Sequence, residues 1–144
     1  VERVRDQMQP YLLERQGGVL VDPRLPTVQG DPVALALVFR HLIENGLKFN
    51  TCSQPRVEVV NIPGDASDLF CSIAIRDNGI GIDSRNLKRI FDLFQRLHRY
   101  EDYPGAGVGL AIARRIVAMH GGTLEVDSKP GEGSTFRIRV PPST

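Results

Sequence analysis

The chain has 144 residues, of which 41% are hydrophobic and 24% are charged, and its formal net charge is +1. This length suits one compact domain that buries roughly two thirds of its unfolded surface. The near-balanced charge excludes the strong positive field typical of proteins that bind nucleic acid or anionic membranes. The longest apolar run, residues 33–39, is too short to cross a membrane. The charged residues 1–6 lack the apolar segment of a signal peptide.

Apolar residues at helical spacing and capping residues predict several helices along the chain. Residues 1–15 are expected to be the tail of an upstream helix or a linker. Residues 31–49 open with an aspartate that can cap a helix and a proline that is tolerated in the first turn. A short helix is predicted over 83–97, and another over 109–120 that stops at a glycine.

Strands are predicted from short apolar or alternating segments, over residues 19–21, 56–62, 69–76, 123–127 and 134–140. Residues 98–107 have no apolar period and are predicted to be a long loop. Helices interleaved with adjacent hairpins indicate an α+β fold. The expected architecture is a two-layer sandwich, a mixed sheet with helices on one face.

A polar stripe runs along the predicted helix over residues 31–49. His41, Asn45 and Lys48 share one face, because they are spaced by four and then three residues. Glu44 lies off that face and can pair with Lys48 four residues later. A solvated helix face is the ordinary interpretation. However, apolar residues flank the stripe and asparagine is a poor helix former, so Asn45 is also a candidate metal ligand.

The segment D-N-G-I-G-I, residues 77–82, directly follows a predicted strand. A turn is the ordinary interpretation, since Asn-Gly is common in turns, but no returning strand follows. Asp77 continues the apolar alternation of the strand, so its carboxylate should point to the buried side, where it needs a hydrogen-bond donor. The exocyclic amine of a base would supply one, and Gly79 and Gly81 would let a flat ring approach the backbone.

Glycines also precede the predicted helix over 109–120, in the segment G-A-G-V-G-L at residues 105–110. Free N–H groups at such a helix start favour a phosphate. The segment is not a dinucleotide fingerprint, because Leu110 stands where the third glycine is needed. It is not a P-loop either, because the chain contains no Gly-Lys pair. Any phosphate site here therefore belongs to another fold.

Five segments together resemble the sequence boxes of one family: an N box, a G1 box, an F box, a G2 box and a further glycine box, at residues 41–50, 77–82, 91–94, 105–110 and 131–136. The chain is thereby similar to the catalytic, ATP-binding domain of sensor histidine kinases. These belong to the superfamily of gyrase, heat-shock chaperone, kinase and mismatch-repair ATPases. Residues 95–112 especially resemble phytochrome-type and hybrid sensor kinases. The resemblance covers about residues 19–140 and implies a Bergerat-type ATP-binding fold, with residues 16–144 as the catalytic domain.

The resemblance implies Mg²⁺ and ATP as cofactors and assigns roles to residues. Asn45 would ligate Mg²⁺, and Lys48 would meet the phosphates as the second catalytic residue. Asp77 would accept the adenine amine, with Thr135 nearby through water. The other implied ATP-binding residues are His41, Gly79, Gly81, Ile82, Gly105, Gly107, Val108, Gly109 and Leu110. A flexible lid is expected over about residues 96–109. The implied lid and F-box residues are Phe91, Phe94 and Arg96, with simple core packing as the alternative for the two phenylalanines.

Two positions of the N box depart from the usual kinase pattern. Position 41 is histidine where asparagine is usual, and position 46 is glycine where alanine is usual. Gly46 is expected to loosen the helix by about 1 kcal/mol relative to alanine. Hydrolytic members of the superfamily activate water with a glutamate at the place of His41. A neutral histidine can act as a base, but we do not expect His41 to be an efficient hydrolytic one.

None of the three histidines, His41, His98 and His120, stands in the H-[DE]-x-x-x-P-type context of a phosphoacceptor. The resemblance therefore implies a domain that transfers the γ-phosphoryl group of ATP to a histidine on a separate dimerisation domain, in two-component signal transduction. The implied partners are the phosphoacceptor helices of its parent kinase and a downstream response regulator. Neither nucleic acid nor direct membrane insertion is expected.

The two cysteines, Cys52 and Cys71, lack metal-type spacing and make no disulfide framework, which favours a reducing compartment. We therefore expect a cytoplasmic domain, whose parent protein could be membrane-anchored. Dimerisation in this family belongs to helices absent from the sequence, so the isolated chain is expected to be monomeric.

Two alternative functions remain open at this point. An anti-sigma-factor serine kinase has the same fold, but such kinases usually carry glutamate in place of His41 and lack the F box. A degenerate kinase that binds nucleotide without turnover is the second alternative. The intact glycine boxes argue against it, whereas His41 leaves room for it.

Overall fold

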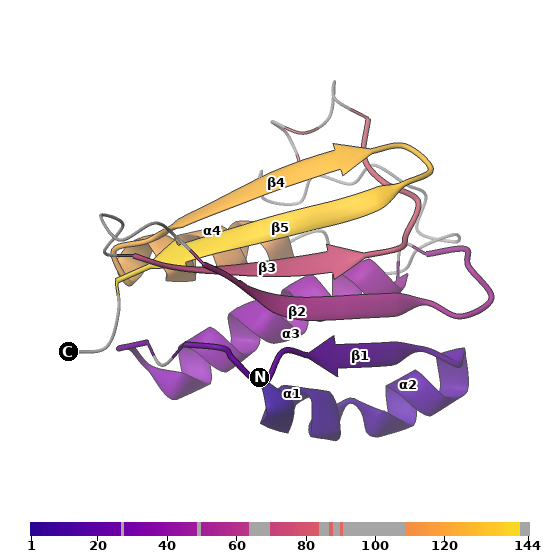
Figure 1. Cartoon of the computed structure of the whole chain (residues 1–144), viewed down its shortest axis with the longest axis horizontal. Helices are drawn as coiled ribbons and strands as arrows, with labels where there is room; N and C mark the ends of the chain where they lie inside the picture. The colour runs from indigo at the N-terminus through magenta and orange to yellow at the C-terminus, as the bar shows by residue number, and fades with distance from the viewer. Residues whose placement is uncertain are drawn as a thin grey trace.

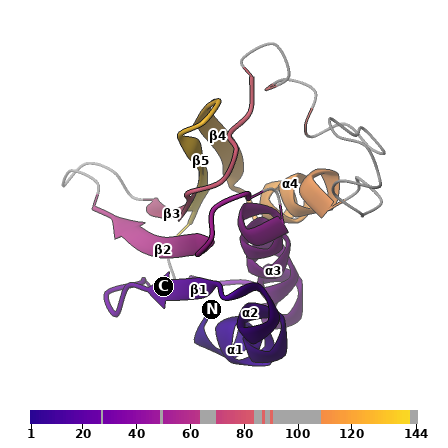
Figure 2. The same cartoon turned by 90° about the vertical axis from the view of Figure 1, so that its right-hand side faces the viewer.

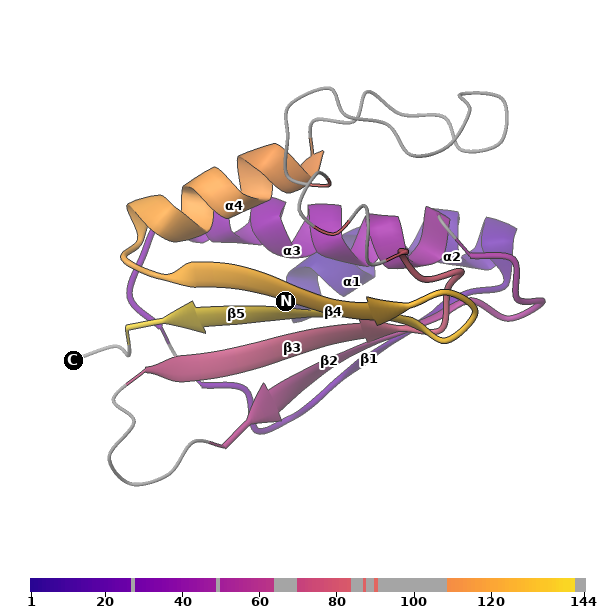
Figure 3. The same ribbon diagram turned by 90° about the horizontal axis from the view of Figure 1, so that it is seen from above.

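The computed structural model describes residues 1–26, 28–48, 50–63, 70–83, 87, 90 and 109–141 (Figure 1). Its elements are α1 (Glu2–Gln7), α2 (Gln9–Arg15), β1 (Gly18–Val21), α3 (Pro32–Lys48), β2 (Arg56–Ile62), β3 (Cys71–Asp77), α4 (Gly109–Met119), β4 (Thr123–Lys129) and β5 (Gly133–Val140). The strands form one sheet in the order β1-β2-β3-β5-β4. Strand β1 pairs with β2 in parallel, and every other pairing is antiparallel. The helices lie on one face of the sheet (Figure 3), so the predicted α+β sandwich is confirmed.

The start of the chain, expected to be the tail of an upstream helix or a linker, is helical and interrupted. Its two short helices, α1 and α2, meet at Met8. Pro10 stands in the first turn of α2, and a proline there lacks the N–H that would continue the hydrogen bonds of α1. The predicted helix over 83–97 and the loop over 98–107 lie largely outside the described residues, so they stay predictions.

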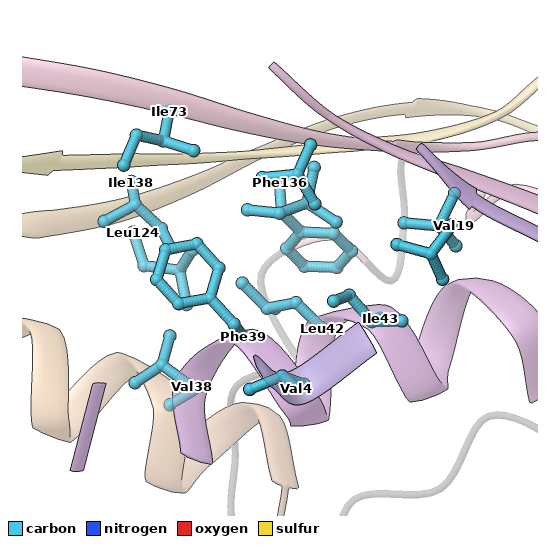
Figure 4. Close-up of a cluster of buried hydrophobic side chains, with 14 of the residues drawn as sticks. Val4, Val19, Val38, Phe39, Leu42, Ile43, Ile73, Leu124, Phe136 and Ile138 are labelled. Atoms are coloured by element: carbon cyan, nitrogen blue, oxygen red, sulfur yellow. The ribbon is translucent and has the colours of Figure 1, made fainter. Parts of the chain in front are cut away.

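The hydrophobic core lies between the sheet and helices α3 and α4. Figure 4 shows Phe39, Leu42 and Ile43 of α3 directed towards the sheet, where Phe136 and Ile138 of β5 face them. Leu42 and Ile43 are almost completely buried, and each such side chain contributes about 1.5–3 kcal/mol by leaving water. This packing holds α3 against the sheet and determines where its polar stripe lies.

Helices α1 and α2 contribute to the same core, beside α3 and β1 (Figure 2). Val4, Met8 and Leu12, which repeat every four residues, are all buried in the core cluster. The break at Met8 therefore keeps the apolar side of both helices against the domain. Whether the catalytic domain begins at residue 16 stays a prediction.

A hydrogen-bonded anchor connects the start of α3 to the end of α4. Oδ1 of Asp31 accepts the backbone N–H groups of Val33 and Ala34 at 2.9 and 3.3 Å, so the predicted cap is present. The N–H of Asp31 donates to Nε2 of His120 at 3.1 Å, and Nδ1 of His120 lies 2.8 Å from the carbonyl of Ile116. Both ring nitrogens of His120 are thus occupied in joining two helices.

Candidate functional site

A cavity of about 350 Å³ opens where β3 and β4 end and β5 begins. Its lining comes from these strands, from the β4–β5 turn and from one residue beyond β3; the residues are Asp77, Leu87, Asp127, Ser128, Lys129, Glu132, Gly133, Ser134 and Thr135. The cavity therefore includes Asp77, the carboxylate that the sequence singled out. It also includes two serines, Ser128 and Ser134, that were not predicted as site residues.

Asp77 is held in the cavity wall by backbone donors. Its Oδ1 accepts the N–H of Gly79 at 2.9 Å and the N–H of Ser134 at 3.2 Å. Oδ2, which lies beside Gly46 of α3, accepts no hydrogen bond from the described part of the chain. Burial raises the pKa of Asp77, and the two N–H donors only partly oppose that rise. A partly desolvated acceptor with one unpaired oxygen suits a ligand that donates a hydrogen bond.

Gly46 explains how α3 comes so close to this carboxylate. A Cβ at position 46 would lie 2.8 Å from Cβ of Asp77 and 2.8 Å from Cγ2 of Val57. Asp77 and Val57 are themselves paired across β3 and β2. The sequence predicted only a looser helix here; the structure shows that glycine also permits this contact.

The loop after β3 packs on the turn between β4 and β5. Gly81 adopts a φ of +77°, and a Cβ there would overlap the carbonyl of Lys129. The carbonyl of Ile80 accepts the N–H of Gly131 at 2.7 Å. The Oγ of Ser128 accepts the N–H of Ile82 at 2.7 Å. The two glycines of the predicted G1 box thus have different roles. The N–H of Gly79 donates to Asp77, whereas Gly81 allows the loop after β3 to approach the backbone of Lys129.

Asn78, between Asp77 and Gly79, joins this loop to the segment before β2. Its Oδ1 accepts from Nδ2 of Asn50 at 2.7 Å and from the N–H of Arg56 at 2.8 Å. Its Nδ2 donates to the carbonyl of Gln54 at 3.3 Å. Asn50 and Asn78 were not predicted as site residues, although their place in the N and G1 boxes was a signal. Their roles are structural, because they fix the loop that carries Asp77.

The polar stripe of α3 faces the first turn of α4. A Cβ on Gly109 would lie 3.0 Å from Nδ1 of His41, so this ring packs directly on the G2 glycine. Burial lowers the pKa of His41, as do the charges of Arg40 and Lys48, against the opposing charge of Glu44. The ring is therefore mainly neutral at pH 7.

The structure does not form the pair of Glu44 with Lys48 that the spacing allows. Glu44 pairs instead with Arg40, one turn earlier, with Oε1 and Nε 3.0 Å apart. Arg40 is exposed and Glu44 is partly exposed. Asn45 and Lys48 are half-buried, and neither makes a hydrogen bond or ion pair to any residue that the structure describes. Both side chains are thus available to a ligand.

The strand register distinguishes Ser134 from Thr135. Thr135 pairs with Arg76 on β3 and Asp127 on β4, on the face of the sheet away from the helices. Ser134 is on the helix-facing side and donates its N–H to Asp77. The alternation of buried Phe136, Ile138 and Val140 along β5 is the signal in the sequence that places Ser134 inward. The geometry favours Ser134 over Thr135 as the partner of Asp77.

Three of the remaining predicted site residues, Ile82, Gly109 and Leu110, lie in the described part of the chain. Gly109 begins α4, and Leu110 is partly buried against the core. Ile82 is held by its N–H bond to Ser128. The lid and several predicted site residues lie outside the described residues and stay predictions: Phe91, Phe94, Arg96, Gly105, Gly107 and Val108.

The described residues contain no group of three His, Cys, Asp or Glu side chains that could hold a metal ion by themselves. Asn45 offers a single amide oxygen, which is a ligand type that Mg²⁺ accepts. Mg²⁺ commonly completes its shell with water and substrate phosphates rather than with protein groups. The residues present therefore fit a Mg²⁺ ion that arrives with a phosphate ligand.

Residues 30–144 match the family model described as histidine kinase-, DNA gyrase B-, and HSP90-like ATPase. The chain therefore belongs to this ATPase family. Within it, the chain is a histidine-kinase-like ATPase domain of sensor kinases, homologous to phytochrome-like and RcsC kinases, and the predicted resemblance is confirmed. No helix in the part of the chain that the structure describes is long and apolar enough to cross a membrane.

Two relatives and two solved structures illustrate the match. The chain is 40% identical to the phytochrome-like protein Cph1 of Synechocystis, over 90% of this chain and 17% of Cph1. It is 33% identical to the sensor histidine kinase RcsC of Escherichia coli, over 92% of this chain and 14% of RcsC. The mycobacterial sensor histidine kinase MprB has a TM-score of 0.76 at 27% identity, covering 97% of this chain and 93% of that one. Full-length ShkA, in complex with AMPPNP, has a TM-score of 0.81 at 27% identity, covering 99% of this chain and 29% of that one.

The chain thus spans less than a fifth of the length of either relative.

Proposed function

We propose that the cavity beside Asp77 binds the adenine of ATP. The observation that carries this proposal is Oδ2 of Asp77, an unpaired oxygen on a partly desolvated carboxylate that lines the cavity. The exocyclic amine of adenine would donate to it, while Gly79 and Ser134 hold Oδ1. Ser134 replaces Thr135 in this proposal as the second residue at the base. The AMPPNP bound in the complex of ShkA is consistent with a nucleotide in this fold.

The same proposal places the phosphates at the stripe on α3. Asn45 would ligate Mg²⁺ through its amide oxygen, and Lys48 would pair with a phosphate. When bound, Mg²⁺ would neutralise charge that develops on the transferring phosphoryl group. Gly109 begins α4 beside His41, so backbone N–H groups of that helix start could also face the phosphates. These residues would position the phosphates of ATP and neutralise their negative charge. Positioning and charge neutralisation are most of what phosphoryl transfer requires.

We further propose that residues 16–144 transfer the γ-phosphoryl group to a histidine on separate phosphoacceptor helices of the parent kinase, and that a response regulator acts downstream. Both ring nitrogens of His120 are occupied, and His41 is packed on Gly109, so neither is a natural acceptor. The free cysteines, Cys52 and Cys71, support a cytoplasmic location.

The isolated chain should bind Mg-ATP without labelling itself, and it should phosphorylate a histidine that is supplied in trans. The test is a single turnover with γ-labelled ATP and a separately purified phosphoacceptor domain of a related kinase. Acid-labile label should appear on the added domain alone. Stable label on this chain that maps to His41, His98 or His120 would contradict the prediction. Binding without any transfer would instead favour a degenerate, regulatory domain.

His41→Asn should leave nucleotide binding and phosphoryl transfer largely intact. His41 packs on Gly109, and asparagine at this position offers a smaller polar side chain, so the change relieves rather than adds crowding. Rates of transfer and of ATP hydrolysis would be compared between the two proteins at saturating Mg-ATP. A fall in transfer of about 100-fold or more, the effect of a lost general base, would show that His41 takes part in the chemistry.

A further inference from the structure

Ser128 stands at a junction of three segments around the cavity. Its Oγ accepts the N–H of Ile82 at 2.7 Å and donates to the carbonyl of Gly133 at 2.9 Å. The same Oγ lies 2.7 Å from Oγ of Ser134. Both serines line the cavity together with Asp77. The proposed contact between adenine and Asp77 gives Ser128 no role of its own.

Counting protons determines which serine donates to the other. A hydroxyl has one proton to give and two lone pairs that accept. The N–H of Ile82 can only donate and the carbonyl of Gly133 can only accept, so the proton of Ser128 goes to Gly133. One lone pair of Ser128 then remains, and it receives the proton of Ser134. The opposite arrangement would give up the bond to Gly133.

The hydroxyl of Ser134 is thereby fixed as an acceptor towards the cavity. Its proton is held by Ser128, and its backbone N–H is held by Oδ1 of Asp77 at 3.2 Å. Ser134 is only 8% exposed, so water has little access to replace the bond to Ser128. Neither serine hydroxyl then has a proton to donate into the cavity. Beside an ionised Asp77, the cavity wall therefore offers a ligand only hydrogen-bond acceptors from these three side chains.

We infer that Ser128 sets the selectivity of the cavity for 6-amino over 6-oxo purines, by holding the Ser134 hydroxyl as an acceptor beside Asp77. This inference rests on the proposed function, since it takes the base to lie at Asp77. The 6-amino group of adenine brings two N–H donors to a wall of acceptors. The 6-oxo group of hypoxanthine brings only lone pairs, and a buried acceptor without a donor loses affinity. Ser128 acts through Ser134, so it is a positioning residue.

The test measures the dissociation constants of MgADP and MgIDP for the 144-residue chain by calorimetry. The wild type should prefer ADP. In Ser128→Ala the Ser134 hydroxyl is free to rotate and donate to a 6-oxo group, so the preference should narrow by about fivefold, the value of one neutral hydrogen bond. Ser128→Thr keeps the hydroxyl and should restore the wild-type ratio. Thr123→Ala removes a hydroxyl from the far end of β4 and serves as the control.

The ratio of the two affinities separates this role from a structural one. Equal losses for ADP and IDP in Ser128→Ala, with an unchanged ratio, would overturn the inference. If Ser128→Ala does not fold, Ser134→Ala serves instead, because it removes the acceptor itself and should also narrow the preference for MgADP over MgIDP. An unchanged preference in Ser134→Ala would likewise overturn the inference. The proposed function fails in a different way: the wild type would show no adenine preference, or Asp77→Asn would leave that preference intact.

Discussion

Asp77→Asn should weaken the binding of adenine nucleotides by about tenfold to a hundredfold, the value of a hydrogen bond to a charged group. The asparagine oxygen can still accept the N–H groups of Gly79 and Ser134, as Oδ1 of Asp77 does. Its NH₂ group then takes the place of Oδ2 and presents a donor to the donating amine of adenine. Calorimetry with MgADP on both proteins measures the loss.

The same substitution should not destabilise the free domain at neutral pH. Burial raises the folded-state pKa of Asp77 above its ordinary value of 3.8. Between 3.8 and that raised pKa the folded state keeps a proton that the unfolded state has lost, so stability falls as pH rises through this window. Asparagine carries no charge to desolvate, so Asp77→Asn should be at least as stable as wild type at pH 7. It should also lack this part of the pH dependence.

Asp127→Asn is the matched control for Asp77→Asn. Asp127 lines the same cavity, but its side chain is 76% exposed and pairs with Arg137, with Oδ2 and Nη2 2.8 Å apart. An exposed ion pair contributes little, so this variant should bind ADP nearly as tightly as wild type. Similar losses of affinity in both aspartate variants, or none in Asp77→Asn, would remove Asp77 from the base site.

Local patterns in the sequence predicted the positions of α3, α4 and the five strands, and the inward direction of Asp77. The helix over Pro32–Lys48 follows from its cap and its apolar period, and the burial of Asp77 follows from the alternation along β3. The role predicted for Thr135, near the adenine through a water, stays a prediction, and Thr135 lines the cavity together with Asp77. The register of β5 places Ser134, not Thr135, on the face of Asp77.

Contacts between residues distant in sequence could not be predicted from these patterns. Gly46 is needed at position 46 because α3 meets Asp77, and His41 meets Gly109 because α3 and α4 pack together. Nothing near Glu44 in sequence shows that it prefers Arg40 to Lys48, since both are four residues away.

The β4–β5 turn allows a comparison of two glycines that share a backbone conformation and differ in surroundings. Gly131 has a φ of +81° and Gly133 a φ of +90°, so an alanine at either position is strained by about 1–2 kcal/mol. A Cβ on Gly131 would meet nothing within 4 Å, whereas a Cβ on Gly133 would overlap the backbone carbonyl of Asp77. We therefore expect Gly133→Ala to lose a further 1–3 kcal/mol or so by overpacking, as measured by urea denaturation.

Nucleotide affinity should separate the two variants more sharply than stability does. Relieving the clash in Gly133→Ala moves the turn away from the end of β3, which pulls the N–H of Ser134 away from Oδ1 of Asp77. Gly131→Ala strains the turn without moving it, so it should bind MgADP nearly as tightly as wild type. If both variants bound MgADP as tightly as wild type, the binding site would tolerate a displacement of the hydrogen bond between Ser134 and the Asp77 carboxylate. The role assigned to its fixed geometry, and to the hydroxyl pair of Ser128 and Ser134 next to it, would then be wrong.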